Sequence, residues 1–312
     1  MSAPTVPEGA TAAAPRPRGA RLGAAATSYA FLLPSLVIFG VFIFFPLVRT
    51  VLLSFQGNDI FGAPSGFVGG QHFQQLITDP AFRNVLITTV LFTLYTVLPS
   101  IVIALIIALL LQRQIRAVRF FRTAFALPFA FSVATASVVF SVLYDPASGV
   151  LNGLLSHLGV GPVNWLTSPS WALPAVCATT VWLQLGYNLL VITAGLGAIP
   201  DDVVEAARLD GAGPFRMLRQ ITLPLITPQL FFLIVVGTIT SLQSFGQINI
   251  LTKGGPNGTT TTTLVYNVYK TAFANNASDY GYASAQALVL LLVVLVVTAV
   301  QFGVLERKVF YS

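Results

Sequence analysis

The sequence predicts an all-α, polytopic membrane protein with six transmembrane helices, and two properties of the chain carry that prediction. Of its 312 residues, 55% are hydrophobic and only 8% are charged. About a quarter of the residues of a soluble domain are charged, so 16 basic and 10 acidic side chains are too few to cover a globular protein of this length. The apolar residues also gather in long runs, and about 20 apolar residues in a helix suffice to cross a bilayer.

Each predicted span is one apolar run of the required length. In order, the runs are 29–55, 84–111, 120–144, 171–197, 226–250 and 282–305. Residues 1–28 are rich in Ala, Pro and Gly, which predicts a disordered tail. A cleaved signal peptide is disfavoured because the apolar run that follows is too long for one. We therefore expect a membrane domain over 29–312 behind a tail over 1–28.

The basic residues predict the orientation of the spans, because Lys and Arg concentrate in cytoplasmic loops. With the N-terminus inside, only four basic residues fall outside: Arg49, Arg83, Lys253 and Lys270. The cytoplasmic side receives Arg16, Arg18, Arg21, Arg113, Arg116, Arg119, Arg122, Arg208, Arg216, Arg219, Arg307 and Lys308. This asymmetry predicts that both termini, and the loop between spans four and five, are cytoplasmic.

That cytoplasmic loop, 198–225, is unusually rich in charge for this chain. Pro200 and Asp201 suit the first turn of a helix, where carboxylates complement the exposed N–H groups. Gly211 stands where a helix would end on a left-handed residue. Pro214 can then begin a second helix that leads into span five. The loop is therefore expected to form a short helix, a glycine turn and another helix.

The first of these helices has the composition of a docking surface. Ala206 and Ala207 add little bulk, so another surface could approach closely, and Glu205, Arg208 and Asp210 could anchor it through charged hydrogen bonds. The alternative is an amphipathic helix on lipid headgroups. An acidic start and few large apolar residues make that alternative less suitable for an anionic membrane.

The stretch "EAARLDGAGPFRMLRQITLPLITP" (205–228) resembles the EAA loop of permease subunits of binding-protein-dependent ABC importers. The matching residues are Glu205, Ala206, Ala207, Asp210, Gly211, Ala212, Ile221, Leu223 and Pro224. Segments 120–132, 189–207 and 251–273 resemble the carbohydrate-uptake branch, of maltose and glycerol-3-phosphate type. The C-terminal "VQFGVLERKVFYS" is most similar to the first permease subunit of glycerol-3-phosphate importers, and the short first outer loop lacks the large insertion of the maltose type.

The resemblance implies a type I ABC importer permease fold in a bacterial inner membrane. It implies a coupling helix that contacts the ATPase through Glu205, Ala206, Ala207, Arg208, Asp210 and Gly211. The implied partners are a second permease in a heterodimer, two copies of an ABC ATPase that bind ATP and Mg, an extracytoplasmic solute-binding protein and the lipid bilayer. The implied solute is glycerol 3-phosphate, a glycerophosphodiester or a sugar.

Two spans carry polar stripes that are candidates for the solute path. Thr180, Gln184, Tyr187 and Asn188 recur at helical spacing in span four, and Thr240, Gln243, Ser244 and Gln247 do so in span five. Neutral hydrogen-bonding groups beside an aromatic ring suit a polyhydroxylated solute. Polar residues in spans also join helices by hydrogen bonds, and that alternative stays open. A neutral oligosaccharide or disaccharide fits the stripes at least as well as a phosphate ester.

Other classes of function lack their usual residues. No P-loop motif occurs, so we expect no nucleotide hydrolysis and no catalytic residue in this chain. His72, His157 and Cys177 lie too far apart for a metal site, and the basic charge fits loop topology rather than nucleic-acid binding. No charged residue lies mid-span, which argues against an ion-coupled secondary transporter. The polar stripes argue against a membrane scaffold.

Overall fold

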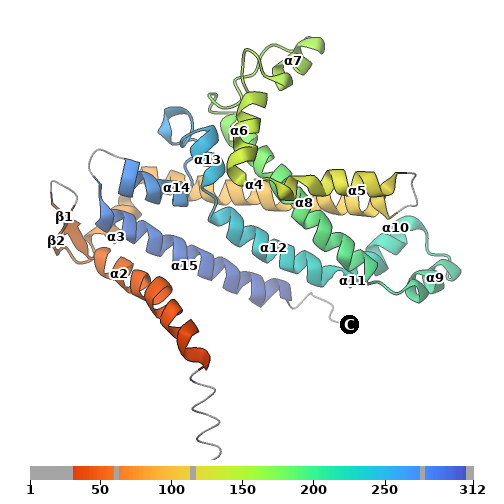
Figure 1. Ribbon diagram of the computed structural model, residues 1–312, viewed down its shortest axis with the longest axis horizontal. Helices are drawn as coiled ribbons and strands as arrows, with labels where there is room; N and C mark the ends of the chain where they lie inside the picture. The colour runs from red at the N-terminus through yellow and green to blue at the C-terminus, as the bar shows by residue number, and fades with distance from the viewer. Residues whose placement is uncertain (1–30, 60–62, 113–116, 275–277, 307–312) are drawn as a thin grey trace, which may run out of the picture. The chain divides into compact units, whose positions relative to one another are not determined.

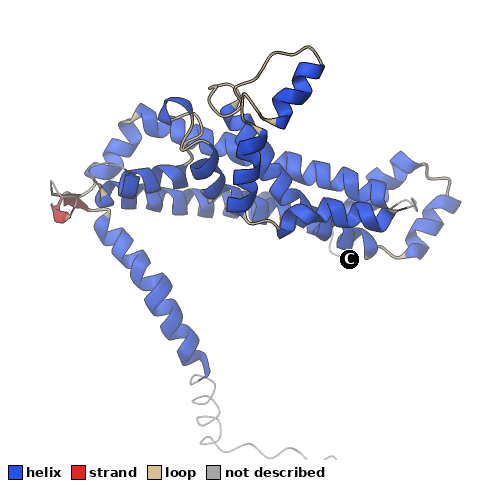
Figure 2. Ribbon diagram, turned by 45° about the horizontal axis from the view of Figure 1, so that its top comes forward, coloured by secondary structure: helices blue, strands red, loops and turns tan. Residues whose placement is uncertain are grey.

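The computed structural model describes residues 31–59, 63–112, 117–274 and 278–306. Most of them are helical (Figure 2), which agrees with the predicted class. The chain divides into two compact units at Thr50, and each is described by itself. The predicted tail 1–28 lies outside the described residues, as do Arg113, Arg116, Arg307 and Lys308, on which part of the predicted orientation rests.

One helix, Phe31–Leu53, contains the described part of the first unit. It includes a single π-helical turn at Gly40–Phe44 and continues as α2, Phe45–Leu53. Its large apolar side chains are exposed, including Phe31, Phe42 and Phe45. Exposed apolar surface along a whole helix is expected where lipid or a partner helix replaces water.

Within the described residues, four helices are long and apolar enough to cross a membrane, and the number rises to six if each of two bent helix pairs counts as one span. The predicted first, second, fourth and sixth spans are the unbent ones. They correspond to the helix at Phe31–Leu53, α4 (Pro80–Leu111), α8 (Ala172–Gly197) and α15 (Tyr280–Leu305).

The predicted third span, 120–144, is not one straight helix. α5 (Val118–Ala126) passes into a 3₁₀ turn, η2 (Leu127–Ala130), and α6 (Val133–Leu143) then leaves at 105° (Figure 1). Pro128 removes a backbone donor at the turn. The Ser132 hydroxyl accepts a hydrogen bond from the Thr135 N–H at 3.1 Å and so begins a new helix.

The predicted fifth span, 226–250, has different limits from those expected. Its helix α12 covers only Thr227–Leu242, and Pro214–Leu225 before it is inclined by 64°. A separate short helix, α13 (Gly246–Leu251), follows. Gly246, the first residue of α13, lets α13 pack closely against α6, because a Cβ at that position would lie 2.8 Å from Val133 Cγ1.

The remaining elements are short and join the spans. They include a two-stranded antiparallel hairpin, which the all-α prediction did not contain. Gln56 pairs with Phe67 and Asn58 with Pro64, and the register shifts between Gln56 and Asn58. The bounds are β1 Gln56–Asn58, β2 Pro64–Phe67, α3 Gln71–Thr78, α7 Val150–His157, α9 Asp201–Leu209, α10 Pro214–Met217, η3 Leu218–Thr222, α11 Leu223–Leu225, η4 Pro256–Gly258, α14 Leu264–Tyr269 and η5 Lys270–Ala274.

The packing core that positions the site lies where α4, α8 and α12 meet. Val97 of α4, Leu189 and Ile192 of α8 and Leu233 of α12 are almost completely buried there. α4 is continuous across Pro99, as membrane helices allow when neighbours satisfy the freed backbone groups. Next to this core, Gly186 brings α8 so close to η2 that a Cβ would lie 2.6 Å from the Ala126 carbonyl oxygen.

Candidate functional site

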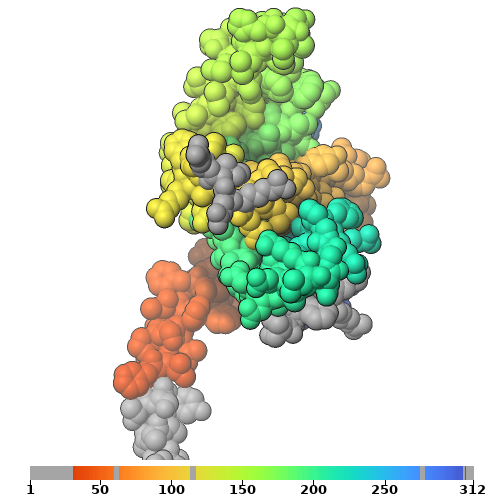
Figure 3. Space-filling model, turned by 90° about the vertical axis from the view of Figure 1, so that its right-hand side faces the viewer, coloured from red at the N-terminus to blue at the C-terminus, as the bar shows by residue number. Residues whose placement is uncertain are grey.

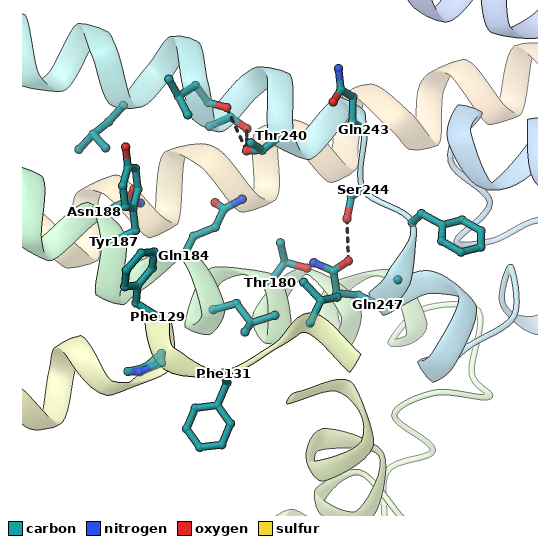
Figure 4. Close-up of a pocket in the computed structure, with 18 residues that line it drawn as sticks. Phe129, Phe131, Thr180, Gln184, Tyr187, Asn188, Thr240, Gln243, Ser244 and Gln247 are labelled. Atoms are coloured by element: carbon teal, nitrogen blue, oxygen red, sulfur yellow. Dashed lines mark hydrogen bonds between the residues drawn. The ribbon is translucent and has the colours of Figure 1, made fainter. Parts of the chain in front are cut away.

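A cavity of about 670 Å³ lies between η2, α8, α12 and α13 (Figure 4). It is the meeting point of the two predicted stripes, because every candidate solute-path residue lines it. These residues are Thr180, Gln184, Tyr187, Asn188, Thr240, Gln243, Ser244 and Gln247.

The α8 stripe forms one helical face, as its spacing predicts. Thr180 and Asn188 are buried at its ends, and Gln184 and Tyr187 are half-buried between them. The Tyr187 ring lies 5.7 Å from the Phe129 ring of η2, centroid to centroid. The two rings form an aromatic part of the cavity lining, beside Gln184 and Asn188 (Figure 4).

The second stripe does not form one helical face, so that part of the prediction is wrong. Thr240 lies in the last turn of α12, Gln243 caps the helix, and Ser244 lies in the break. Gln247 belongs to α13, where its Oε1 accepts a hydrogen bond from the Ser244 hydroxyl at 2.9 Å. These residues share the cavity because the chain turns at the break, and not because of helical periodicity.

A buried hydrogen-bond network behind the cavity was missed from the sequence. Asn188 Nδ2 donates to Ser100 Oγ at 3.0 Å, and Ser100 Oγ donates to Gln184 Oε1 at 3.1 Å. Gln184 Nε2 donates to Ser241 Oγ at 3.3 Å, and Ser241 Oγ lies 3.0 Å from Thr96 Oγ1. The network therefore joins α4, α8 and α12, and gives Gln184 and Asn188 the helix-joining role left open above.

A sequence signal for this network exists in the second span. Thr89, Thr93, Thr96 and Ser100 recur at helical spacing and are all buried on one face of α4. Their hydroxyls each donate to a backbone carbonyl of the same helix three or four residues earlier, so small hydroxyl residues fit a span without an unpaired donor. Such a stripe is easily taken for ordinary apolar spacing.

The cavity offers neutral polar chemistry. Among its lining residues in the described part of the chain there is no Asp, Glu, Lys or Arg. The same part of the chain contains no cluster of three His, Cys, Asp or Glu side chains that could hold a metal ion. Amides, hydroxyls and aromatic rings can bind a hydroxylated solute through hydrogen bonds and ring stacking.

The cytoplasmic-loop prediction agrees with the local structure of α9 and its turn. Gly211 has a φ of 76°, in the left-handed region. Its N–H donates to the Arg208 carbonyl and that of Ala212 to the Ala207 carbonyl, both at 3.0 Å, which is the Schellman arrangement at a helix end. α10 begins at Pro214, as expected. The turn is thus specified by local backbone bonds.

The exposed residues of α9 and α10 stand at the surface in Figure 3, in green and teal. Glu205, Ala206, Arg208, Asp210 and Gly211 are exposed, as a docking role requires. Ala207 is buried, because it is only 8% exposed and packs against its own chain. It therefore cannot offer a contact surface as the other candidates do.

Two exposed apolar side chains in this segment were not singled out from the sequence. Leu209 is 86% exposed and Phe215 is 74% exposed. They flank the Gly211 turn on either side. Large apolar side chains that stand singly at a surface are common, but this pair adds apolar anchors to a surface that the sequence describes as charged and small.

Comparison with known proteins shows the family and the fold of the chain. Residues 6–311 match the family described as binding-protein-dependent transport system inner membrane component. The sn-glycerol-3-phosphate transport system permease protein UgpA of Agrobacterium fabrum is 36% identical over 287 residues, which cover 91% of this chain and 96% of that protein. The UgpA of Brucella abortus is 37% identical with the same coverage.

Solved structures of low sequence identity share the fold. A chain of a bacterial ABC transporter that imports the acidic polysaccharide alginate is 24% identical, with a TM-score of 0.79 over 93% of this chain and 98% of that chain. A second alginate transporter structure, in complex with an alginate pentasaccharide-bound periplasmic protein, gives the same TM-score at 23% identity, over 93% of this chain and 97% of that chain. The chain therefore belongs to the family of binding-protein-dependent transport system inner membrane components, and is a multi-pass inner-membrane permease of an ABC importer.

Proposed function

We propose that this chain is a non-catalytic permease subunit that forms, with a second permease, the path for a small hydroxylated solute. An ABC importer also requires an ATPase and a binding protein. In this proposal two ATPase copies bind the ATP and Mg, and this chain binds no cofactor of its own. The cavity that both polar stripes line is the observation that carries the proposal.

The preferred solute is sn-glycerol 3-phosphate or a glycerophosphodiester. The support is the relationship to permeases named for sn-glycerol-3-phosphate transport, at 36% and 37% identity over most of the chain. The phosphate would then meet its positive partner outside this cavity, in the second permease or at helix N-termini, because the described lining residues carry no cation.

A neutral oligosaccharide or disaccharide is the second candidate, and the same uncharged lining favours it. Competition separates the two candidates. The complex is reconstituted with its own binding protein, and uptake of labelled sn-glycerol 3-phosphate is measured with and without excess unlabelled maltose. Uptake of sn-glycerol 3-phosphate that unlabelled maltose does not reduce supports the phosphate ester. Uptake of labelled maltose by a complex that does not take up sn-glycerol 3-phosphate selects the sugar.

The segment 198–225 is proposed to couple ATP-driven movement in the ATPase to the spans. Its acidic α9 start, its exposed Glu205, Arg208 and Asp210, and the apolar Leu209 and Phe215 suit a cleft with both charged and apolar contacts. Ala207, which is buried, packs α9 against the rest of the chain and does not contact the ATPase in this proposal. In this proposal both termini and the loop are cytoplasmic. The permease domain covers 29–312 and follows the tail over 1–28.

The energy source that drives uptake is the most direct test of the transporter class. An ATP-driven permease should take up solute only with the ATPase and ATP, and the purified chain alone should not hydrolyse ATP. Uptake by the chain alone, driven by a proton or sodium gradient, would instead identify an ion-coupled secondary transporter.

A further inference from the structure

Ser100 holds two cavity amides at once, although it is not among the residues that line the cavity. It is fully buried on α4, with 0% of its surface exposed. Asn188 and Gln184, four residues apart on α8, both point at its hydroxyl from one helical face. One hydroxyl thus contacts the amide nitrogen of one residue and the amide oxygen of the other.

A hydroxyl has one proton and two acceptor lone pairs, and this fixes what each amide can offer elsewhere. Because Ser100 accepts from Asn188 Nδ2, the Asn188 carboxamide is oriented with its nitrogen toward α4. No described residue donates a hydrogen bond to Asn188 Oδ1, and Asn188 lines the cavity, so this oxygen can accept a hydrogen bond from a solute. The Ser100 proton is shared between Gln184 Oε1 at 3.1 Å and the Val97 carbonyl at 3.0 Å.

A second serine orients an amide on the facing wall. Ser244 donates to Gln247 Oε1 at 2.9 Å (Figure 4), and Gln247 Nε2 has no acceptor among the described residues. The cavity therefore presents an acceptor on α8, from Asn188, and a donor on α13, from Gln247. A solute hydroxyl can donate to the first, and an oxygen of the same solute can accept from the second.

We propose that Ser100 is a positioning residue that sets this polarity, and that it makes the permease prefer solutes whose hydroxyl can donate a hydrogen bond. The inference rests on the proposed solute path. Without the Ser100 hydroxyl, the Asn188 carboxamide can turn over and present its nitrogen to the cavity. The Asn188 nitrogen can then donate a hydrogen bond to an ether oxygen of the solute, at a point where the wild-type cavity requires a solute hydroxyl that donates.

The test compares Ser100→Ala with Ser137→Ala. Ser137 is equally buried, at 0% exposure, and its hydroxyl donates only to the Val133 carbonyl of its own helix. Both changes remove the same atom, but only the first removes a hydrogen bond between helices. Ser100→Thr, which keeps a hydroxyl, tests rescue.

Uptake by the complex reconstituted with its binding protein is measured for sn-glycerol 3-phosphate against its 2-O-methyl ether, and for maltose against a partly O-methylated maltose. The binding protein is the same throughout, so a changed ratio reports on the permease. Ser100→Ala should lower the preference for the hydroxyl form by about 2- to 12-fold, the range expected for one neutral hydrogen bond. The KM should carry the change, and the amount of assembled complex should match that of Ser137→Ala.

The results distinguish a failure of the proposed solute path from a failure of the positioning role of Ser100. If the wild-type complex takes up neither probe, the proposed solute path fails and the inference fails with it. If the wild type shows the preference and Ser100→Ala keeps it, as Ser137→Ala should, the positioning role alone is overturned. A loss of assembled complex in Ser100→Ala but not in Ser137→Ala would also overturn it, because Ser100 would then act in packing.

Discussion

The cavity wall and the α9–α10 segment are stabilised in opposite ways. Gln184 is held by hydrogen bonds to two other helices, from Ser100 of α4 and to Ser241 of α12. Gly211, in contrast, is held by backbone bonds within its own turn. The cavity is therefore specified by tertiary packing, whereas the α9–α10 segment is specified by local backbone bonds and has an exposed surface.

The largest effect is expected from reversing a charge on the α9–α10 surface. Glu205→Lys should abolish solute-stimulated ATP hydrolysis and uptake, because disrupting a buried, hydrogen-bonded charge pair at an interface costs about 2–5 kcal/mol. Proteoliposomes with the assembled complex provide the measurement. Glu306→Lys reverses another exposed charge, at the end of α15, and should have no effect. Normal coupling in Glu205→Lys would remove the contact from the proposal.

A smaller effect is expected in the packed region, at Gly186. Gly186→Ala would place a Cβ 2.6 Å from the Ala126 carbonyl oxygen and 2.8 Å from the Phe129 nitrogen. Overpacking of this kind costs about 1–3 kcal/mol, so the melting temperature of the purified complex should fall. Gly197→Ala, at the C-terminal end of α8 with no atom within 4 Å of the new Cβ, should leave the melting temperature unchanged. Equal melting temperatures would show that η2 yields at no cost.

Gly211 tests the turn of the α9–α10 segment by strain alone. No atom lies within 4 Å of a Cβ at this position, so Gly211→Val acts only through its φ of 76°. A left-handed conformation costs an L-residue about 1–2 kcal/mol. Uptake should fall while the binding protein keeps its affinity for solute. Gly213→Val is the matched control, because Gly213 is equally open and has a φ of −69°.

The smallest effect is expected from a single cavity amide. Gln247→Met should weaken uptake by about 0.5–1.5 kcal/mol, the value of one neutral hydrogen bond, and leave assembly intact. Gln184→Met should weaken uptake more than Gln247→Met does, because it also removes the hydrogen bonds to Ser100 and Ser241 that position this part of α8. If both variants lose assembly equally and keep their solute preference, the amides serve packing only.

Cysteine labelling measures how accessible the cavity residues are to a polar reagent, without an uptake assay. With Cys177 replaced, a cysteine at position 243 should react quickly with a polar thiol reagent, because Gln243 is exposed in the cavity lining. Cysteines at 188 and 247 should react slowly, since Asn188 is 5% exposed and Gln247 is 7% exposed. Bound solute should protect position 243. Absence of labelling at all three positions during normal transport would exclude this solute path.

Local features of the fold were predictable because local rules govern them. The Gly211 turn follows from a helix end that needs a left-handed residue, and the start of α10 follows from Pro214. The stripe of Gln184 and Asn188 follows from helical spacing within an unbroken α8. In contrast, the packing of α13, which carries Gln247, against α6 depends on the close approach of Gly246 to Val133, a contact between distant parts of the chain.

The sequence by itself determined that this chain crosses a membrane, that a charged helix–glycine–helix segment separates two spans, and which family it resembles. Composition and spacing are sufficient there because burial in lipid and helix capping act over one helix or less. Only the tertiary structure decided that both stripes meet in one cavity, that Phe129 and Tyr187 share a wall of it, and that Ser100 orients the α8 amides. The crossing of helices decides which of their faces meet, and no single helix contains that information.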